Sequence, residues 1–482
     1  MTESTLAQQL ADFAAGATYD RLPGDVVASV RERVLDTLGI CYAAIDLETS
    51  RGVAQVVAGQ GGTRQATALG VAHRVPAGQA ALMNGVLAHS LDYDDTHLPS
   101  VLHPSATVVP TALAVAQATG ASGRATIAAI AVGLESAIRL GMAGYDRESG
   151  NSTFFEHGQH ATSICGAVGS AVSAAVLLGL DSTGIRDAIG VAGSMASGII
   201  ESNRNGGTVK RLHCGWAAHA AVNAAQFAEH GMTGPATVLE GRFGFFQAWL
   251  HGRFDPSAIT DGLGEEWSVP GIFFKPYPAN HFTHAAVDAA LELRAAGLRP
   301  DQVVSVEIGV AGPTIRTVGE PIEVKRAPRT GYMAQFSLPY VFAAALSGGG
   351  GLGLSLDDFS DERAKDPDLR SLMSRIDVHA DSRCDAVFPY HFPATVRVQT
   401  VAGEVLTCDV MVNRGSPERP LSTEELGAKF ADNVSGVLDD QQAEQVRQTA
   451  AGLAELSDVN ALLIAEIGVQ GAKERVEEGS GR

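Results

Sequence analysis

The chain has 482 residues, of which 45% are apolar and 18% are charged, and its formal net charge is −19. This composition is typical of a globular protein and excludes a disordered or fibrous chain. The 54 acidic side chains outnumber the 35 basic ones, which argues against binding to nucleic acid or to an anionic membrane surface, because both need a basic surface. The length predicts two or three domains.

The five cysteines are scattered and form no CxxC pair, so the sequence predicts neither a disulfide framework nor a zinc site. The first residues, MTESTLAQQLADFAAG, carry acids and no basic residue ahead of an apolar run, which is unlike a signal peptide. We therefore expect a cytoplasmic protein.

Residues 1 to about 265 predict a series of alanine-rich helices, because apolar residues recur at three- and four-residue spacing between glycine and proline breaks. The run ICGAVGSAVSAAVLLGL, residues 164–180, carries no charge. It is slightly short for a bilayer and rich in small residues. We interpret it as a buried helix at the centre of a helical bundle.

The pattern changes from about residue 273. A helix is expected near 283–296, followed by alternating apolar segments that predict strands, the last of them split by Ala402-Gly403 as in a hairpin. These strands are expected at 303–310, 375–381 and 394–412. A helical pattern returns from about 422 to 467.

The fold class that follows is mainly α with an inserted α+β domain. Residues 1–268 and 415–482 are predicted to form one discontinuous, all-helical domain. Residues 269–414 are predicted to form a smaller α+β domain inserted between them.

Three aspartates and two histidines fall within LDYDDTHLPSVLHPS, residues 91–105. A predicted helix ends just before this stretch, so Asp92 and its acidic neighbours lie where negative charge opposes the helix dipole. The next predicted helix begins near Pro104, which places His103 at or just before an end whose free N–H groups favour a bound carboxylate or phosphate. A histidine beside a bound anion keeps its proton and suits a general acid.

Two other interpretations of this stretch are a solvated turn and a metal site. Aspartate and histidine are both metal ligands, but no glycine and distal glutamate follow at calcium-loop spacing, and the chain has no HExxH motif. We therefore predict no metal. Within the stretch, Asp94, Asp95 and His97 are interpreted as residues that shape and cap the turn.

Three later clusters add titratable side chains. EHGQHATSICG places His160 at the start of the charge-free helix. GGTVKRLHCGWAAHAA delivers Lys210 and Arg211 beside His213, and FFKPYPANHFTHAA places Lys275 at the boundary between the two predicted domains, where ligand sites are common. A few cations and helix-start histidines in an acidic protein predict a site for a small polycarboxylate.

The four motifs, in this order, resemble the MmgE/PrpD family over nearly the whole chain. The resemblance implies a large helical domain, an inserted α+β lid domain and a homodimer. It also implies one of three activities: 2-methylcitrate dehydration, cis-aconitate decarboxylation or iminodisuccinate epimerisation. These activities generally need no metal or organic cofactor.

Carried onto the matching positions of this chain, the resemblance implies a site made of Asp92, Thr96, His103, His160, Lys210 and Lys275, with Tyr340 contributed by the lid. Two positions depart from the family's pattern. Gln159 replaces an aromatic residue that often precedes the second histidine, and Asn280 stands where the decarboxylating branch tends to carry histidine, with His281 adjacent. We predict His281 and Arg211 as further substrate-binding residues.

The mechanism we expect is proton transfer at a carbon next to a carboxylate. Lys210 and Lys275 would stabilise an enolate-like intermediate. His103 would be the principal acid or base, and His160 a second proton carrier or a substrate anchor. Loss of hydroxide, loss of carbon dioxide and reprotonation on the other face are all open to such an intermediate. A lyase is therefore the first prediction, an epimerase the alternative, and a non-catalytic binding protein the contrasting class.

Overall fold

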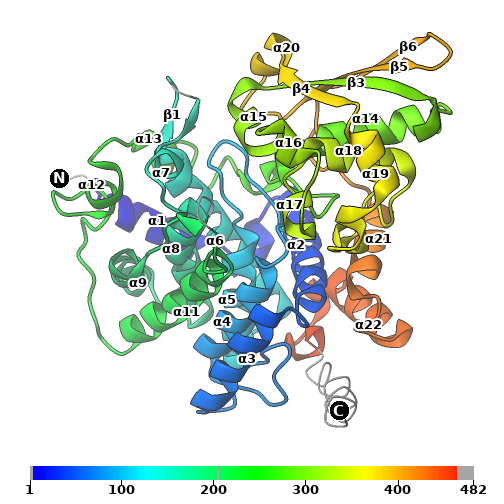
Figure 1. The fold of residues 1–482 in the computed structure, drawn as a ribbon. Helices are drawn as coiled ribbons and strands as arrows, with labels where there is room; N and C mark the ends of the chain where they lie inside the picture. The colour runs from blue at the N-terminus through cyan, green and yellow to red at the C-terminus, as the bar shows by residue number, and fades with distance from the viewer. Residues whose placement is uncertain (1–3, 149, 203–205, 464–482) are drawn as a thin grey trace. The chain divides into compact units, whose positions relative to one another are not determined.

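The computed structural model describes residues 4–148, 150–202 and 206–463 (Figure 1). The chain divides into two compact units, one formed by residues up to Ile272 and from Asn433 onward, the other by Phe273–Asp432. The predicted fold class, mainly α with a smaller α+β part, is confirmed. Residues 464–467 of the predicted C-terminal helical segment lie outside the described residues.

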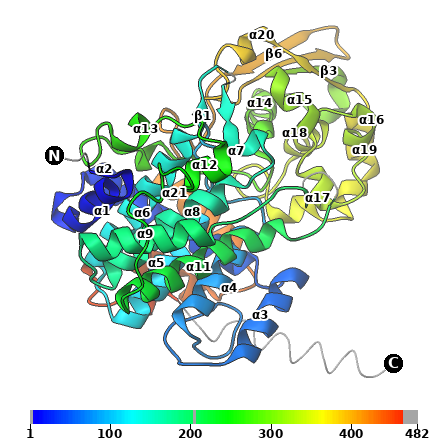
Figure 2. The ribbon, with the colours of Figure 1, turned by 90° about the vertical axis from the view of Figure 1, so that its left-hand side faces the viewer.

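The first unit is built from helices, together with one antiparallel pair of two-residue strands, β1 (Tyr145–Asp146) and β2 (Asn151–Ser152). Figure 2 shows the same helices from the side. Their bounds are α1 Leu6–Gly16, α2 Gly24–Ala43, α3 Glu48–Gln60, α4 Ala77–Ala88, α5 Ser105–Thr119, α6 Gly123–Ala143, α7 Thr153–Glu156, α8 Ala161–Leu177, α9 Ser182–Met195, α11 Lys210–Glu229, α12 Phe245–Leu250, α13 Ser257–Thr260 and α22 Asp440–Ala451.

Helix α8 lies at the centre of this unit, in contact with α5, α6, α9 and α11. It is buried along almost its whole length, which confirms the prediction made from its charge-free sequence. Among the described helices, α6 alone is long and apolar enough to cross a membrane, and 89% of its most apolar window is buried within the protein.

Helices α4 and α11 touch at a pair of glycines. A Cβ atom added to Gly85 on α4 would lie 2.8 Å from the Cα atom of Gly215 on α11, and one added to Gly215 would lie 2.3 Å from the carbonyl oxygen of Leu82. Both distances are shorter than a real carbon contact, so no larger side chain fits between the two backbones. This contact sets the spacing between the end of α4 and the start of α11.

The C-terminal segment returns to the first unit. Helix α22 packs against α2. Further along, the N–H of Gly123 at the start of α6 donates to the carbonyl oxygen of Leu456 at 2.9 Å. The first unit is therefore assembled from both ends of the described chain.

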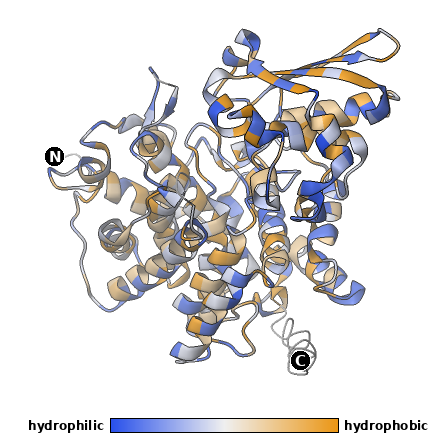
Figure 3. Cartoon of the chain, in the orientation of Figure 1, coloured by the Kyte–Doolittle hydropathy of each residue, from blue (hydrophilic) through white to orange (hydrophobic). Residues whose placement is uncertain are grey.

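The second unit contains a four-stranded sheet in the order β4-β3-β5-β6. Strand β3 pairs in parallel with β4 and antiparallel with β5, and β5 and β6 form the predicted hairpin around Gly403, whose φ is 81°. Along the strands hydrophobic and hydrophilic residues alternate, as in a sheet with one buried face (Figure 3). The strands are β3 Val303–Val310, β4 Ile376–Ala380, β5 Ala394–Thr400 and β6 Val405–Val410.

Helix α14 contacts β5 and β6, while α18 contacts α14 and β4, so these two helices and the sheet share one apolar core. Its residues come from every strand and from both helices. The helices of the unit are α14 His284–Ala295, α15 Gly312–Val318, α16 Ile322–Lys325, α17 Gly331–Ala334, α18 Leu338–Ser347, α19 Pro367–Met373, α20 Ser382–Asp385 and α21 Thr423–Val434, the last of which crosses into the first unit.

Candidate functional site

Four histidines come together in the first unit, and we call them the histidine cluster. His89 follows α4, His103 lies just before α5, His160 precedes α8, and His213 is in the first turn of α11. The ring centres of His89 and His103 are 5.4 Å apart, those of His89 and His160 5.3 Å, and those of His160 and His213 5.0 Å. Each ring is contributed by a different helix terminus.

His103 is held by its Nδ1 atom. This nitrogen lies 2.7 Å from the carbonyl oxygen of Asp95 and 3.3 Å from the hydroxyl of Thr96, and the backbone N–H of His103 donates to Thr162 Oγ1 at 3.1 Å. A carbonyl oxygen only accepts, so Nδ1 carries the hydrogen. The other ring nitrogen, Nε2, is therefore the one that can exchange a proton with a ligand.

The Asp94 carboxylate contacts two members of the histidine cluster, His89 and His103. Its Oδ2 atom lies 2.6 Å from Nδ1 of His89 and 3.9 Å from Nδ1 of His103, and the Asp94 carboxylate is buried. The sequence interpretation of Asp94 as a turn residue is thus incomplete, because its carboxylate orients the His89 ring. His89 Nε2 is buried and has no hydrogen-bond partner among the described residues.

Asp95 has a structural role. Its carboxylate forms a 2.8 Å ion pair with Arg33 of α2 and accepts hydrogen bonds from the backbone N–H and the hydroxyl of Ser105. Burial raises the pKa of the Asp95 carboxyl, and the Arg33 guanidinium opposes this shift. The start of α5, which we expected to favour a bound anion, therefore already holds a carboxylate of the protein itself.

His97 lies in the same turn. A 2.7 Å hydrogen bond joins its Nδ1 atom to Oγ of Ser100. Its backbone pairs with that of Leu102. Burial, helped by the charge of Arg33, lowers the pKa of His97 to about 4. These contacts agree with the prediction that His97 shapes the turn.

Lys210 begins α11, and its Nζ atom lies 3.9 Å from Oδ1 of Asp92. Asp92 has a φ of 53°, in the left-handed region that aspartate adopts more readily than most residues. The Lys210 side chain is 24% exposed and that of Asp92 12%. Lys210 is three residues before His213 and so lies on the same face of α11, with the Asp92 carboxylate beside it.

His160 and His213 face each other through their Nδ1 atoms at 3.1 Å. Burial lowers the pKa of His160 well below its ordinary value, and the neighbouring basic groups His89, Lys210, His213 and His103 act in the same direction. Burial, with His89 and Lys210, lowers the pKa of His213 to about 4. Both rings are therefore neutral near pH 7.

Arg211 is directed at a different neighbour. Its guanidinium donates to Thr49 Oγ1 on α3 at 2.9 Å. Its predicted role in substrate binding stays a prediction.

Three predicted site residues belong to the second unit. Lys275 is buried, with 1% of its surface exposed, and the backbone N–H of the preceding Phe274 donates to the carbonyl oxygen of Gly415 at 3.0 Å. His281 is also buried, and its ring centre lies 4.7 Å from that of His284. The Tyr340 hydroxyl donates to the carbonyl oxygen of Asp358 within the core. The predicted roles of these residues stay predictions.

Sequence reasoning missed four contributors to the cluster: His89, His213, Asp94 and Arg33. His213 stands beside Lys210 in the sequence, and the predicted site does not include it. The signal that could have found it is the i, i+3 spacing from Lys210 in a predicted helix. No comparable signal marks Arg33, whose partner Asp95 is 62 residues away in the chain.

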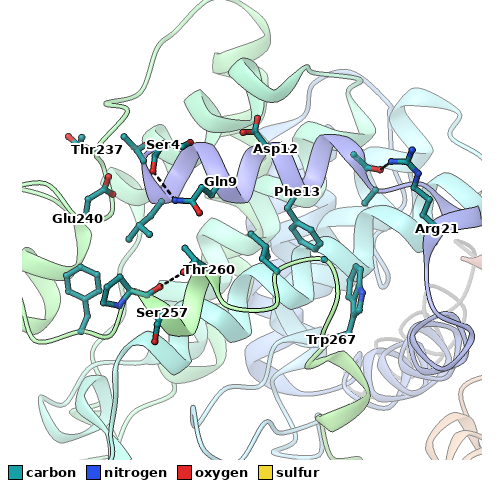
Figure 4. Close-up of a pocket in the computed structure, with 18 of the residues that line it drawn as sticks. Ser4, Gln9, Asp12, Phe13, Arg21, Thr237, Glu240, Ser257, Thr260 and Trp267 are labelled. Atoms are coloured by element: carbon teal, nitrogen blue, oxygen red, sulfur yellow. Dashed lines mark hydrogen bonds between the residues drawn. The ribbon is translucent and has the colours of Figure 1, made fainter. Parts of the chain in front are cut away.

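An open hollow of about 1350 Å³ lies elsewhere in the first unit, between α1 and α13 (Figure 4). Phe13 and Trp267 face each other in it with ring centres 5.4 Å apart. None of the histidine cluster lines this hollow. Among the described residues, no group of three or more histidine, cysteine or acidic side chains has the geometry of a metal site. The histidine cluster is therefore the candidate site.

A helical unit carrying buried histidines, carboxylates and a lysine, followed by an α+β unit, defines a protein equipped to bind an anion and move protons. The MmgE/PrpD N-terminal domain matches residues 8–257, and the MmgE/PrpD C-terminal domain matches residues 277–455. The chain belongs to the MmgE/PrpD family.

Similar proteins match over nearly their whole length. The human cis-aconitate decarboxylase is 28% identical, covering 96% of this chain and 94% of the relative. The mouse cis-aconitate decarboxylase is 26% identical, with 96% and 93% covered. The cis-aconitate decarboxylase of Aspergillus terreus is 24% identical, with 96% of both chains covered.

Proposed function

We propose that this protein is a cofactor-independent lyase that acts on a small di- or tricarboxylate by proton transfer next to a carboxylate, with decarboxylation of a cis-aconitate-like tricarboxylate as the leading form. The observation that carries the proposal is the end-to-end match to cis-aconitate decarboxylases in a chain whose helix termini bring four histidines together.

The substrate anion would be held by Lys210, which is the partly exposed cation beside the cluster. Lys275, His281, Tyr340 and Arg211 are retained as predicted contributors, and Asp92 and Thr96 as predicted polar contacts.

In the decarboxylation, the carbon–carbon bond to one carboxylate breaks and carbon dioxide leaves. The electron pair left behind is delocalised toward the neighbouring carboxylate, where a lysine charge stabilises it. A carbon atom then takes a proton, so one hydrogen replaces the lost carboxylate. His103 suits this proton transfer, because its Nδ1 is fixed by Asp95 and its Nε2 is the exchanging nitrogen.

The test is to incubate the protein with cis-aconitate and, separately, with 2-methylcitrate in deuterated water and to record proton spectra. The proposal expects a product that is shorter by one carbon and carries one deuterium. A new alkene with all carbons retained would show dehydration instead, and deuterium exchange without net change would show an epimerase or isomerase. Binding without turnover of any of these carboxylates would overturn the enzymatic proposal.

The homodimer belongs to the same proposal and rests on the resemblance to the family, while the cytoplasmic location stays a prediction. Sedimentation of the purified protein at micromolar concentration would test the homodimer.

A further inference from the structure

The Asp94 carboxylate lies beside two imidazole rings and is shielded from water. Its Oδ2 atom lies 2.6 Å from Nδ1 of His89 and 3.9 Å from Nδ1 of His103, and 4% of the Asp94 side chain is exposed. The neighbouring Asp95 pairs with Arg33, whereas Asp94 faces ring nitrogens that are charged only when both nitrogens of the ring carry hydrogen. A charged carboxylate is costly to bury unless a cation lies beside it, so a positive charge is favoured on one of these two rings.

Of the two rings, His103 is better suited to carry that charge. Its Nδ1–H already donates to the carbonyl oxygen of Asp95 at 2.7 Å, so the added hydrogen lies on Nε2, and 14% of the His103 side chain is exposed. The His89 side chain is 1% exposed, and its Nε2 has no hydrogen-bond partner among the described residues. A second hydrogen on His89 would therefore be a buried N–H group without an acceptor, which costs free energy.

We propose that the Asp94 carboxylate is the counter-ion that keeps His103 charged near pH 7, with a hydrogen on both ring nitrogens. Asp94 is a positioning residue in this scheme, because it acts through His103. The charge of His103 is a property of the protein alone, whereas its use in catalysis rests on the function proposed above.

The basic groups around His103 oppose its charge, and the Asp94 carboxylate offsets them. The ring of His89, after α4, has its centre 5.4 Å from that of His103. His160, before α8, also interacts electrostatically with His103, and Lys210 on α11 acts on His160 in turn. Since the pKa of His160 is lowered, mainly by burial, the His160 ring adds no positive charge near pH 7.

Two thiols and one carboxyl group lie near Asp94. Burial raises the pKa of Cys41 on α2 and of Cys214 on α11, and the Asp94 charge raises both further. These two thiols therefore stay uncharged near pH 7 and add no negative charge. Burial also raises the pKa of Asp95, and there the Arg33 charge lowers the pKa by more than the Asp94 charge raises it.

A charged His103 has a proton to deliver. When the bond to one substrate carboxylate breaks, carbon dioxide leaves, the electron pair remains on the substrate, and the hydrogen on His103 Nε2 moves to a substrate carbon. His103 is then neutral, with its Nδ1–H still on the Asp95 carbonyl oxygen. It takes a new proton from water before the next cycle. One proton is consumed for each carbon dioxide released, so a charged donor is needed once per turnover.

The test compares three variants with the wild-type protein. Asp94→Asn removes the charge, while the asparagine oxygen can still accept from Nδ1 of His89. Asp94→Glu keeps the charge. Asp46→Asn removes the same charge from a position that is 78% exposed and is the matched control. Nitrogen spectra of ¹⁵N-histidine-labelled protein without substrate, recorded from pH 5 to pH 9, follow each ring, and a His103→Asn sample identifies the His103 signals.

In the wild-type protein we expect His103 to carry two ring hydrogens at pH 7 and His89 to carry one. In Asp94→Asn the titration of His103 should move down by about 1 pH unit or more, the size expected when a nearby opposite charge is lost. In Asp46→Asn it should not fall, and in Asp94→Glu it should lie above that of Asp94→Asn. A neutral His103 or a doubly protonated His89 in the wild type at pH 7 would overturn the proposal. Equal His103 titrations in Asp94→Asn and the wild type would do the same.

The catalytic half has its own readout. On the accepted carboxylate, kcat should fall as the pH rises through the titration of His103, and in Asp94→Asn this fall should begin at a lower pH by the same shift. KM should not rise, because the substitution removes a negative charge near an anion site. A purely structural defect would instead lower kcat at every pH.

The two halves fail separately. If the titration of His103 moves in Asp94→Asn and the kcat profile does not, His103 is not the proton donor and the catalytic half is overturned. If no carboxylate is turned over by the wild type, the function proposed above fails, and the substrate-free titration still decides whether Asp94 is the counter-ion of His103.

Discussion

Nζ of Lys210 lies 3.9 Å from Oδ1 of Asp92, and the Lys210 side chain is 24% exposed. The exposed part of this cation can bind an incoming carboxylate. Lys210→Gln should raise KM for an anionic substrate by about 10-fold or more, because a hydrogen bond to a charged group contributes roughly 1.5–3 kcal/mol. Lys210→Arg, which keeps the charge, should recover part of the loss. Equal KM values for Lys210→Gln and the wild type would reject the anion-binding role.

His103 can be tested with a pair of substitutions that separates position from proton transfer. His103→Ala should lower kcat by roughly 10²–10⁴. His103→Asn keeps an amide N–H near the position of Nδ1, so it can still bond to the Asp95 carbonyl oxygen, but it lacks Nε2. We expect it to be as inactive as the alanine variant in steady-state kinetics. Near-normal turnover in a folded His103→Asn protein would remove Nε2 from the mechanism.

The buried ion pair between Arg33 and Asp95 is expected to stabilise the turn that carries the site. Arg33→Met should destabilise the protein by about 3–5 kcal/mol, because it leaves a buried carboxylate without its partner. The double variant Arg33→Met/Asp95→Leu should be more stable than Arg33→Met alone. Thermal unfolding of the three proteins measures this order, and a double variant less stable than Arg33→Met would contradict it.

The glycine contact between α4 and α11 predicts a packing defect. Gly215→Ala places a methyl group against the backbone of α4 and should cost about 1–3 kcal/mol of stability. Gly52→Ala, on an exposed part of α3 with open space around the new methyl group, is the control and should be neutral or stabilising by up to ~1 kcal/mol. Chemical unfolding of both variants checks the contrast, which would be absent if the helices moved apart freely.

Acidification should destabilise the protein in a defined window. The pKa of His97 is about 4 in the folded protein because of burial and then Arg33, against an ordinary value of 6.5. Between pH 6.5 and 4 the unfolded chain therefore binds a proton that the folded protein refuses, so stability falls as the pH falls, by up to about 1.4 kcal/mol per pH unit. His97→Gln should show a shallower slope in this window and the same slope above pH 7. An unchanged slope below pH 6 would contradict the low pKa.

Local pattern in the sequence was enough to predict the helix that became α8, the strands of the sheet and the β5–β6 hairpin, because periodicity and turn residues report directly on the backbone. It also placed His103 and His160 at helix starts. The contact between His160 and His213 could not be predicted from the sequence. The two residues are 53 positions apart and are brought together only by helix packing.

The burial of Arg33 is a second feature that the sequence does not predict. In the sequence Arg33 is one of several charges in an amphipathic helix, and only the fold reveals that it is buried against Asp95. Glu135 and Arg139 give another example. They are four residues apart on α6 and pair at 2.7 Å, and only the fold reveals that this pair is buried and that Arg139 also donates to carbonyl oxygens of residues 259–266.

The return of α22 to α2 has a consequence during synthesis. Residues up to Ile272 leave the ribosome well before the segment that completes their packing, because the whole second unit is made in between. At ordinary elongation rates the delay is roughly ten seconds or more. During that time the face of α2 that α22 will cover is exposed, so the nascent chain presents a surface that chaperones can bind, and a chain truncated before Asp440 would keep that surface permanently open.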